Sequence, residues 1–531
     1  MAQDSPRLTR RALLAAGAAA VGAAVWPWRD ARGHIEGSLL GPNKTAGHKL
    51  RAGSLPAPSA FRKSAVLIAG GGAAGLSAAR RLRQAGVEDF LVTELEPQAG
   101  GNARWGEGPV SAYPWGAHYL PLPDAGSNAV VELLKEYGVV TGSDAAGRPV
   151  FDERWLCHDP EERIFSHGRW ESGLYPSVGI SSVEEEERGR FEARMESFRR
   201  LKTKDGRPAF AVPMVRSSSD PELLALDALS FGDWLTREGF TGERIRWYAD
   251  YACRDDFGAR LESTSAWAGI HYFAARGADD SVLTWPEGNG WLVKRLAEPL
   301  EQRLKTGVLV IRVEETRSGV EADLMDVDTG SVTRVTAKSA VIALPRFVAA
   351  RVVAGLGVSA AFQYAPWTVS NLTLEDPPSG IGAEPAWDNV FYKGESLGYV
   401  VATHQKMGPR GRSTVWTHYH AYADGEPAAQ RASLEKTPWA AHRDRVLDDL
   451  ERALPGVSSS VRRLDVWTWG HGMIRPAPGF MFGKERLAAL RPRGRIHFGH
   501  SDLSGFSLFE EAQYRGIKAA EGALTVLTKG A

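Results

Sequence analysis

An apolar run that passes directly into a glycine-rich turn constrains this chain more than any other stretch. Residues 66–75 read Val-Leu-Ile-Ala-Gly-Gly-Gly-Ala-Ala-Gly, and the helix-like segment 76–86 follows at once. This order is typical of the strand, turn and helix that hold a dinucleotide pyrophosphate, because the helix N-terminus faces the negative charge. The glycines permit a tight turn, a close approach of the backbone to the phosphates and close packing of helix on strand. The residues predicted at this site are Gly70, Gly72, Ala74 and Gly75.

A second apolar run ends at an acidic residue, Glu94, close to the spacing at which a carboxylate accepts hydrogen bonds from the adenosine ribose. The pair Gly100 and Gly101 follows. Together they resemble the second motif of the flavin-containing amine oxidase and phytoene desaturase superfamily, in which Gly-Gly-Arg lies against the cofactor. Asn102 stands where that arginine is usual, so Arg104 is the candidate for the positive charge. The resemblance implies FAD rather than NAD; a glycine turn without a ligand is the alternative.

Segments far downstream resemble the same superfamily. Residues 496–520 resemble its C-terminal FAD motif, in which an acid reaches the ribityl and pyrophosphate region, and Asp502 is that acid. Residues 308–313 resemble the strand that contacts adenine through backbone groups, with Val313 as the predicted contact, and 340–345 resemble the strand that closes the nucleotide domain. The resemblance therefore implies an FAD-binding domain assembled from separated segments.

The predicted fold is α/β. It has a Rossmann-like FAD-binding domain with a doubly wound parallel sheet, interwoven with a substrate domain of mixed sheet and helices. The 531 residues exceed what one core usually supports, which also favours two domains. The FAD-binding domain is predicted at 64–123, 301–350 and 481–531, and the substrate domain comprises a mainly helical part, 124–300, and a sheet, 351–480.

Three patterns add detail to this division. Residues 128–137 are amphipathic and predict a helix that ends at a glycine. The charged stretch 183–206 predicts a solvated helix. Residues 360–425 alternate apolar and polar side chains, which predicts an antiparallel sheet. The resemblance implies that this sheet forms the floor of the substrate cavity.

The N-terminus has the pattern of a twin-arginine export signal, predicted at 1–25. Arg10 and Arg11 precede an apolar run that is too short for a standard membrane span. We expect an exported, for example periplasmic, protein that meets the twin-arginine machinery. Cleavage after about Ala24 and retention as a membrane anchor both stay open, and residues 26–63 are predicted as a linker.

Residues 112–121 resemble the superfamily segment that passes close to the isoalloxazine ring, with Gly116 and Ala117 against it. The match implies that His118 and Tyr119 lie near the reactive face, as the candidate catalytic residues. A neutral histidine there can act as a base, whereas a histidine that hydrogen-bonds the backbone is the structural alternative. Trp469 lies in a segment that resembles the one closing over the ring, and is either a ring-packing wall or a core residue.

Other side chains are weaker candidates. His471 and Arg475 could bind substrate. Glu510 and Glu511 stand at the predicted helix start near the flavin, where the helix dipole favours a carboxylate. The acidic pair at 255–256 could enter the cavity, but a surface turn is the favoured interpretation.

The sequence also departs from the superfamily. Amine oxidases usually carry a lysine that holds a water near the flavin, and the matching strand 366–374 has none. The tyrosines that frame amines are not evident; Phe480 and Phe506 stand nearby instead. The resemblance therefore implies the superfamily but not amine oxidation.

Charge and cysteine content exclude several classes. A net charge of +0 and a pI of about 7.3 give no electrostatic basis for binding nucleic acid or an anionic membrane. Cys157 and Cys253 are too few for a disulfide framework or a four-cysteine metal site, and no metal is predicted. They form one bridge or stay two thiols. Neither lies in the C-terminal motif, so the flavin is expected to be noncovalent.

We therefore expect an exported FAD-dependent oxidoreductase that removes hydride from an unidentified, medium-sized and partly apolar organic substrate. An isoprenoid or lipid desaturase or isomerase is one alternative. A flavin-binding electron-transfer or partner subunit without its own substrate is another.

Overall fold

The computed structural model describes residues 32–51, 56–276, 281–406 and 411–529. The predicted signal, 1–25, lies outside these ranges. No helix within them is both long and apolar enough to cross a membrane.

One sheet gathers strands from distant parts of the chain. Its spatial order is β12 (Leu304–Lys305), β3 (Phe90–Thr93), β2 (Ala60–Ala69), β15 (Val332–Ile342), β14 (Val320–Asp326) and β13 (Val308–Glu315), and β21 (Ile496–Phe498) also pairs with β15. The pairs from β12 to β15 and the pair of β15 with β21 are parallel, whereas β13, β14 and β15 form an antiparallel meander. Strands from three separated segments therefore build one nucleotide-type sheet.

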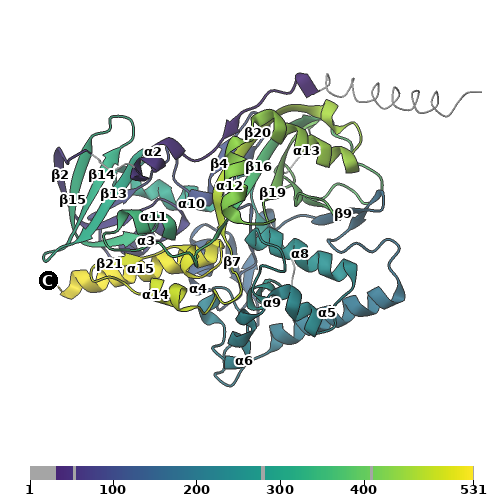
Figure 1. Cartoon of the computed structure of the whole chain (residues 1–531), viewed down its shortest axis with the longest axis horizontal. Coiled ribbons are helices and arrows are strands. Elements are labelled where there is room, and N and C mark those ends of the chain that lie inside the picture. The colour runs from purple at the N-terminus through teal and green to yellow at the C-terminus, as the bar shows by residue number, and fades with distance from the viewer. Residues whose placement is uncertain (1–31, 52–55, 277–280, 407–410, 530–531) are drawn as a thin grey trace, which may run out of the picture.

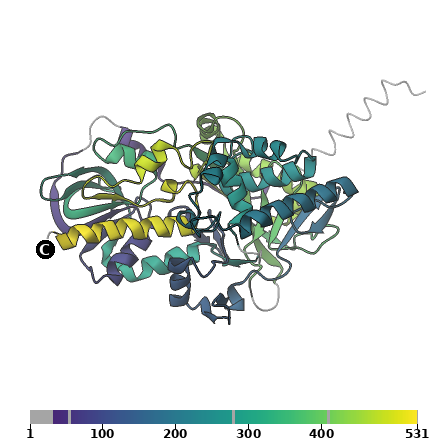
Figure 2. The same ribbon diagram turned by 90° about the horizontal axis from the view of Figure 1, so that it is seen from below.

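Both faces of this parallel sheet are buried, which explains why β2 is continuously apolar. Val66 and Ile68 pack against helices, whereas Leu67 and Ala69 pack against the meander. The helices on the first face are α3 (Ala73–Gln84), α4 (Asn128–Glu136), α10 (Gly290–Ala297) and α15 (Phe509–Lys529). Figures 1 and 2 show α15, in yellow, running along this domain.

The second domain contains a mixed sheet. Its order is β1 (Leu39–Leu40), β20 (Val461–Ile474), β16 (Tyr364–Glu375), β19 (Ser413–Ala421), β18 (Gly398–Val401), β17 (Asp388–Phe391), β9 (Glu162–Ser166) and β10 (Arg169–Ser172). Leu372 and Leu374 of β16 pack towards α13 (Trp439–Ala453), while Trp367 and Val369 face the opposite side. Because both faces are covered, β16 is buried along nearly its whole length. The antiparallel sheet predicted over 360–425 is confirmed by the pairing of β16 with β19, of β19 with β18 and of β18 with β17.

Helices cover the other side of the second domain. α5 (Ser182–Arg200) begins with a capping box between Ser181 and Glu184, and buries one stripe with Phe191 and Met195. The charged stretch predicted as a solvated helix is therefore amphipathic and ends at Arg200. α8 (Glu243–Phe257) and α9 (Ala266–Ala274) belong to the same core, and Figure 1 shows α8 between α5 and the mixed sheet.

Short elements complete the described chain. The helices are α2 (Lys44–His48), α6 (Pro221–Leu224), α7 (Phe231–Arg237), α11 (Arg346–Val352), α12 (Pro427–Lys436) and α14 (Lys484–Ala489). Paired strands are β4 (Trp105–Glu107) with β5 (Ala112–Pro114), β6 (Tyr119–Pro121) with β11 (Val282–Thr284), and β7 (Val140–Ser143) with β8 (Pro149–Phe151).

The predicted fold class, a doubly wound nucleotide domain interwoven with a mixed-sheet and helical domain, is confirmed. Details of the division differ. The segment 26–63 is more than a linker, because it contributes β1 to the second sheet, the helix α2, and the first residues of β2. The segment 124–300 supplies β9 and β10 as well as helices, and its α10 packs on the nucleotide domain.

Gly75 gives a test of the helix–strand contact. A Cβ atom at this position would stand 1.9 Å from the Gly70 carbonyl oxygen. Gly75→Ala should therefore force α3 away from β2 and destabilise the protein by about 1–3 kcal/mol, as overpacked cores do. Thermal unfolding measures this as a lower melting temperature. Gly189→Ala in α5 is the matched control, because nothing lies within 4 Å of its Cβ position; equal melting temperatures for the two variants would contradict the account.

Candidate functional site

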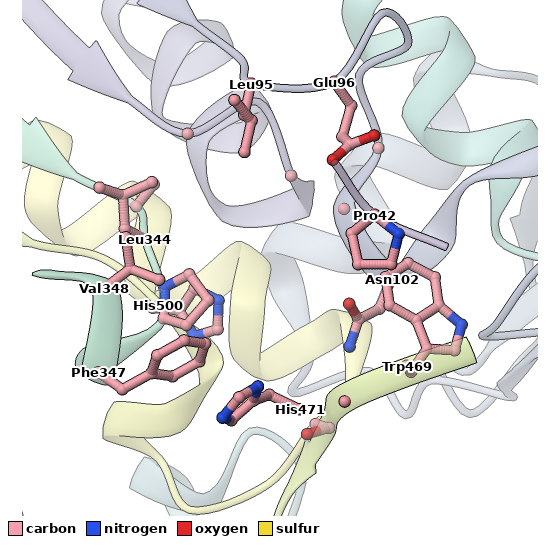
Figure 3. A pocket seen from close by; sticks show the side chains of 18 of the residues that line it. Pro42, Leu95, Glu96, Asn102, Leu344, Phe347, Val348, Trp469, His471 and His500 are labelled. Carbon is pink, nitrogen blue, oxygen red and sulfur yellow. The ribbon is translucent and has the colours of Figure 1, made fainter. Parts of the chain in front are cut away.

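Two adjoining cavities lie where the domains meet. The larger has a volume of about 570 Å³ and the smaller about 130 Å³. Figure 3 shows the larger one, with Leu344, Phe347 and His500 on one side and Asn102 and Trp469 on the other. Residues that line both cavities are Asn102, Ala117, Asn289, Trp469, Ser507, Leu508 and Phe509. A ligand filling the larger cavity therefore meets a ligand of the smaller one at this shared wall.

Two glycine turns border the larger cavity. Gly70 has a φ of +105°, and α3 begins at Ala73 with no side-chain cap, so the first N–H groups of the helix stand at the cavity. Gly100 and Gly101 both have positive φ and pack against the first turn, since a Cβ on Gly101 would lie 3.2 Å from the Gly72 Cα atom. Gly70, Gly72, Ala74, Gly100 and Gly101 all line the cavity, whereas Gly75 lies behind the wall. This cradle fits a pyrophosphate.

The carboxylate of Glu94 is held at the same cavity. It accepts hydrogen bonds from the N–H groups of Gly71 and Glu96, each at 2.9 Å. Burial raises the pKa of Glu94, and the two backbone hydrogen bonds oppose that effect. A carboxylate oxygen has further lone pairs, so the fixed side chain can also accept from ribose hydroxyls.

Two predicted cofactor contacts, Arg104 and Val313, do not line the larger cavity. Arg104 forms an ion pair with Glu96 at 3.0 Å and lies over the ring of Trp467, so it lines neither cavity. The positive charge of Arg104 is therefore paired with the Glu96 carboxylate of the same chain. Val313 is buried in the core of the meander, and the β13 residues that line the larger cavity are those at 308–310. The expected adenine contact is therefore three to five residues nearer the start of the strand.

Asp502 also differs from its predicted place. Its carboxylate accepts hydrogen bonds from the Arg346 N–H at 2.9 Å and from the Tyr364 hydroxyl at 2.6 Å, and it does not line the larger cavity. Its neighbours His500 and Ser501 do. Both hydrogen bonds go to Oδ2, and Oδ1 lies 2.9 Å from the Nδ1 atom of His500. Asp502 thus fixes the loop before α15.

Of the two weaker candidates for substrate binding, His471 and Arg475, only the first lines a cavity. His471 lines the larger cavity, stacked on Phe347 with ring centroids 4.1 Å apart, and burial lowers its pKa to about 4. Arg475 is buried outside both cavities, where it donates to the Ser263 hydroxyl at 2.7 Å. It is not positioned to bind substrate.

Aromatic side chains form one wall of the smaller cavity. Trp367 comes from β16, Tyr419 from β19 and Trp469 from β20. Trp469 is fixed by a hydrogen bond of 2.6 Å from its Nε1 to the Trp115 carbonyl. Because Trp469 also lines the larger cavity, it separates the two sites.

The segment with the predicted catalytic residues completes this wall. Gly116, Ala117, His118 and Tyr119 all line the smaller cavity. The ring of His118 lies 4.7 Å from that of Tyr419, and burial lowers the pKa of His118 to about 3. His118 is therefore neutral at physiological pH and a weak proton acceptor. Burial raises the pKa of Tyr119. The base role of His118 stays a prediction.

Carboxyl groups also line the smaller cavity. Asp255 and Asp256 belong to the last turns of α8 and line the smaller cavity, so the expectation of a surface turn is wrong. Glu510, in the first turn of α15, joins them. Burial raises the pKa values of Asp255 and Glu510 to about 7. Asp256 forms an ion pair of 2.5 Å with Arg276.

Sequence reasoning missed several parts of this site. Asn289 and Tyr419 carry no local motif, and only the fold brings them to the cavities. Arg276, which also lacks a motif, is connected to the smaller cavity through its ion pair with Asp256. The Asn289 Oδ1 atom is buried without a hydrogen-bond partner among the described residues and lines both cavities, so it offers an acceptor to a bound group. Glu511 differs from Glu510, since it accepts from the Met214 N–H away from the smaller cavity.

The departures noted in the sequence also have structural counterparts. Among the described residues, no lysine lines the smaller cavity, and Asn371 of β16 instead donates to the Pro114 carbonyl at 2.9 Å. Phe480 and Phe506 belong to the helical core. Cys157 and Cys253 are both unpaired and buried. Within the described ranges no cluster of histidine, cysteine and acidic residues could hold a metal.

Comparisons with known proteins agree with this geometry. The family model described as flavin containing amine oxidoreductase matches residues 73–524. A comparison with curated sequences finds no match. Two solved structures share 16% identity over 88% of this chain: putrescine oxidase bound to putrescine (TM-score 0.65, 100% of that chain) and cyclohexylamine oxidase from Brevibacterium oxydans IH-35A (TM-score 0.63, 99% of that chain). A CLA-producing fatty acid isomerase from P. acnes is similar at TM-score 0.59 and 14% identity, over 86% of this chain and 97% of that one. At these identities the similarity is one of fold.

The fixed carboxylate gives a test of cofactor binding. Glu94→Ala removes an acceptor for the ribose hydroxyls, and hydrogen bonds to a charged group contribute about 1.5–3 kcal/mol. The dissociation constant of FAD, measured by titrating apoprotein, should rise by about tenfold to a hundredfold. Glu435→Ala is the control, because Glu435 lines the same cavity but is an exposed carboxylate. Unchanged FAD affinity in Glu94→Ala would exclude the ribose role.

Proposed function

Because the chain belongs to the flavin-containing amine oxidoreductase family, whose members are FAD-dependent enzymes, we propose that it oxidises a small, partly apolar amine. The substrate binds in the smaller cavity, and a hydride leaves the carbon next to its nitrogen. When bound, FAD supplies the hydride acceptor. The chain's own residues bind the amine, orient its C–H bond and handle the proton.

The carboxyl groups that line the smaller cavity carry this proposal. Asp255 and Glu510 line a cavity that aromatic side chains also line, and Asp256 is the third acid there. Carboxylates attract an ammonium group, and aromatic faces favour both cations and apolar carbon. A cationic head with an apolar body fits both kinds of side chain in the cavity.

The same carboxyl groups are candidates for accepting the ammonium proton of the substrate. An amine gives up hydride readily only after its ammonium proton is removed, so a group that titrates near neutral pH is needed. Asp255 and Glu510 have pKa values of about 7 because they are buried, whereas the pKa of His118 is about 3. We therefore propose the carboxyl pair as the proton acceptor and His118 as a positioning residue.

Two alternatives are less well supported. A lipid desaturase or isomerase requires a long apolar channel, and a fatty acid would bring its carboxylate towards three acids. A flavin-binding partner subunit would need no such cavity. Bound flavin that neither amines nor oxygen can turn over would favour that subunit.

Substitution of the carboxyl pair tests the proton role. Because both acids lose their protons as pH rises through about 7, the rate of flavin reduction by an amine should rise over that range and then level off. Asp255→Asn with Glu510→Gln should remove this pH dependence and lower the rate by about 10²-fold. Rapid mixing without oxygen measures both effects.

His118→Asn is the comparison variant in the same cavity. A positioning role predicts lower thermal stability and a flavin reduction rate within severalfold of the wild type, with the pH dependence kept. A loss of about 10²-fold with a changed pH profile would instead assign the base to His118 and contradict the carboxyl pair.

We further propose that the protein is exported by the twin-arginine machinery and acts in the periplasm or another exported location. Arg10 and Arg11 precede an apolar run that ends at Val25. Export after folding suits a flavoprotein, since FAD can be inserted in the cytoplasm. A membrane association would arise only if the signal segment is kept.

The arginine pair gives a test of export. Arg10→Lys with Arg11→Lys should hold a folded, flavin-bound precursor in the cytoplasm, because the receptor reads both guanidinium groups. Cell fractionation with flavin fluorescence measures the distribution. Arg7→Lys, outside the pair, is the control and should be exported; normal export of the double variant would contradict the proposal.

A further inference from the structure

A strap formed by residues 35–51 crosses the larger cavity from one domain to the other. In Figure 1 it is the purple segment that starts beside the mixed sheet and continues to α2 near the meander. Four of its residues line the cavity: Pro42, Lys44, His48 and Arg51. The strap lies N-terminal to the glycine motif, in the part of the chain that the sequence predicted as a linker.

One end of the strap is fixed to the mixed sheet. Leu39 and Leu40 form β1, which pairs in parallel with Val466 and Trp467 of β20. Ile35 is buried in the core that also contains α13. The backbone approaches closely at Gly37, where a Cβ atom would stand 1.8 Å from the Leu464 carbonyl oxygen.

The other end is fixed to the nucleotide domain. The Asn43 N–H donates to the Glu96 carboxylate at 2.7 Å, beside the ribose-binding Glu94. Leu50 packs against the apolar side chains of the meander, including Leu309. The strap therefore spans the cavity between two anchored ends, and a molecule in the cavity lies beneath it.

The strap presents positive charge to this cavity. His48 and Arg51 form no ion pair among the described residues, and the single pair of Lys44 is a 4.0 Å contact to Glu435. Arg431 on α12 lines the same cavity, also without an ion pair in the described chain. Asn102 provides no charge where the superfamily usually has arginine. Unpaired cations at a cavity call for an anionic ligand, and a dinucleotide brings a pyrophosphate.

We propose that the strap is a cofactor latch: its two anchored ends close the exit of bound FAD, and Lys44 and Arg51, with His48 between them, neutralise the pyrophosphate in place of the missing arginine. Release of FAD then requires β1 to separate from β20. The latch concerns cofactor retention and does not depend on which substrate the enzyme oxidises.

Displacing the anchored end tests the mechanical part. Gly37→Ala forces the strap away from Leu464, whereas Gly33→Ala is the matched control because nothing lies within 4 Å of its Cβ position. The rate of FAD release is measured by the rise in flavin fluorescence after dilution of holoenzyme. We expect Gly37→Ala to release FAD at least about tenfold faster and Gly33→Ala to match the wild type. Equal rates for both variants would overturn the latch.

Removing the charges tests the electrostatic part, and it stands even if Gly37→Ala fails to fold. Lys44→Ala, His48→Ala and Arg51→Ala are combined in one exposed segment, with Lys49→Ala as control because Lys49 does not line the cavity. We expect the dissociation constant of FAD to rise at least about tenfold and its dependence on salt to weaken. A dissociation constant and salt dependence equal to those of Lys49→Ala would overturn the assignment. Neither readout uses turnover, so failure here leaves the proposed amine oxidation untouched.

Discussion

The contact between the backbone at Gly75 and the carbonyl of Gly70 is the constraint on which the cofactor half of the molecule depends. With no side chain between them, α3 lies directly on the end of β2. Its N-terminus therefore opens on the larger cavity, and the second glycine pair packs against the same turn. Glu94 is then held by the backbone N–H of Gly71 at a fixed distance from that N-terminus. The close contact of Gly75 with Gly70 therefore positions both the helix N-terminus that can bind phosphates and the carboxylate that can accept hydrogen bonds from ribose.

The properties of the smaller cavity depend on the free-energy cost of burying carboxyl groups and on the ion pair that offsets part of this cost. Burying three carboxyl groups is costly, and the protein offsets part of this cost through the ion pair of Asp256 with Arg276. Asp255 and Glu510 form no ion pair among the described residues, and burial raises their pKa values to about 7. Groups that are only partly ionised at neutral pH are suited to exchange a proton with a ligand. The shared wall at Trp469 brings this chemistry beside the cofactor cavity.

The features that could be predicted from sequence are those that local geometry determines. The strand, glycine turn and helix at 66–86 form a continuous segment, and Glu94 ends the next strand along the sheet. Arg104 and Asp502 could not be placed, because each contacts a side chain from a distant segment: the Arg104 guanidinium lies over the Trp467 ring, and the Asp502 carboxylate accepts from Tyr364. Which residues of β13 reach that cavity depends on the register of the sheet, which the sequence does not determine. The cavity is therefore lined by residues 308–310, and the predicted contact Val313 lies further along the strand.

Other parts of the site had no local signal at all. The acids at 255–256 look like any polar pair until α8 is packed against the mixed sheet. The two residues of β1 pair with a strand more than 400 positions later, and no periodicity indicates such a contact. These are the places where the tertiary structure, rather than local propensity, determines the role of a residue.

We propose that the acid-lined cavity presents an amine to the flavin. The most direct measurement mixes oxygen-free holoenzyme with three molecules of one shape, such as benzylamine, benzyl alcohol and benzoate, and follows the flavin absorbance. We expect that the amine alone bleaches the flavin, faster above neutral pH than below, and that the carboxylate neither binds to the protein nor reduces the flavin. Reduction by the alcohol with no response to the amine, or tight binding of the carboxylate, would contradict it.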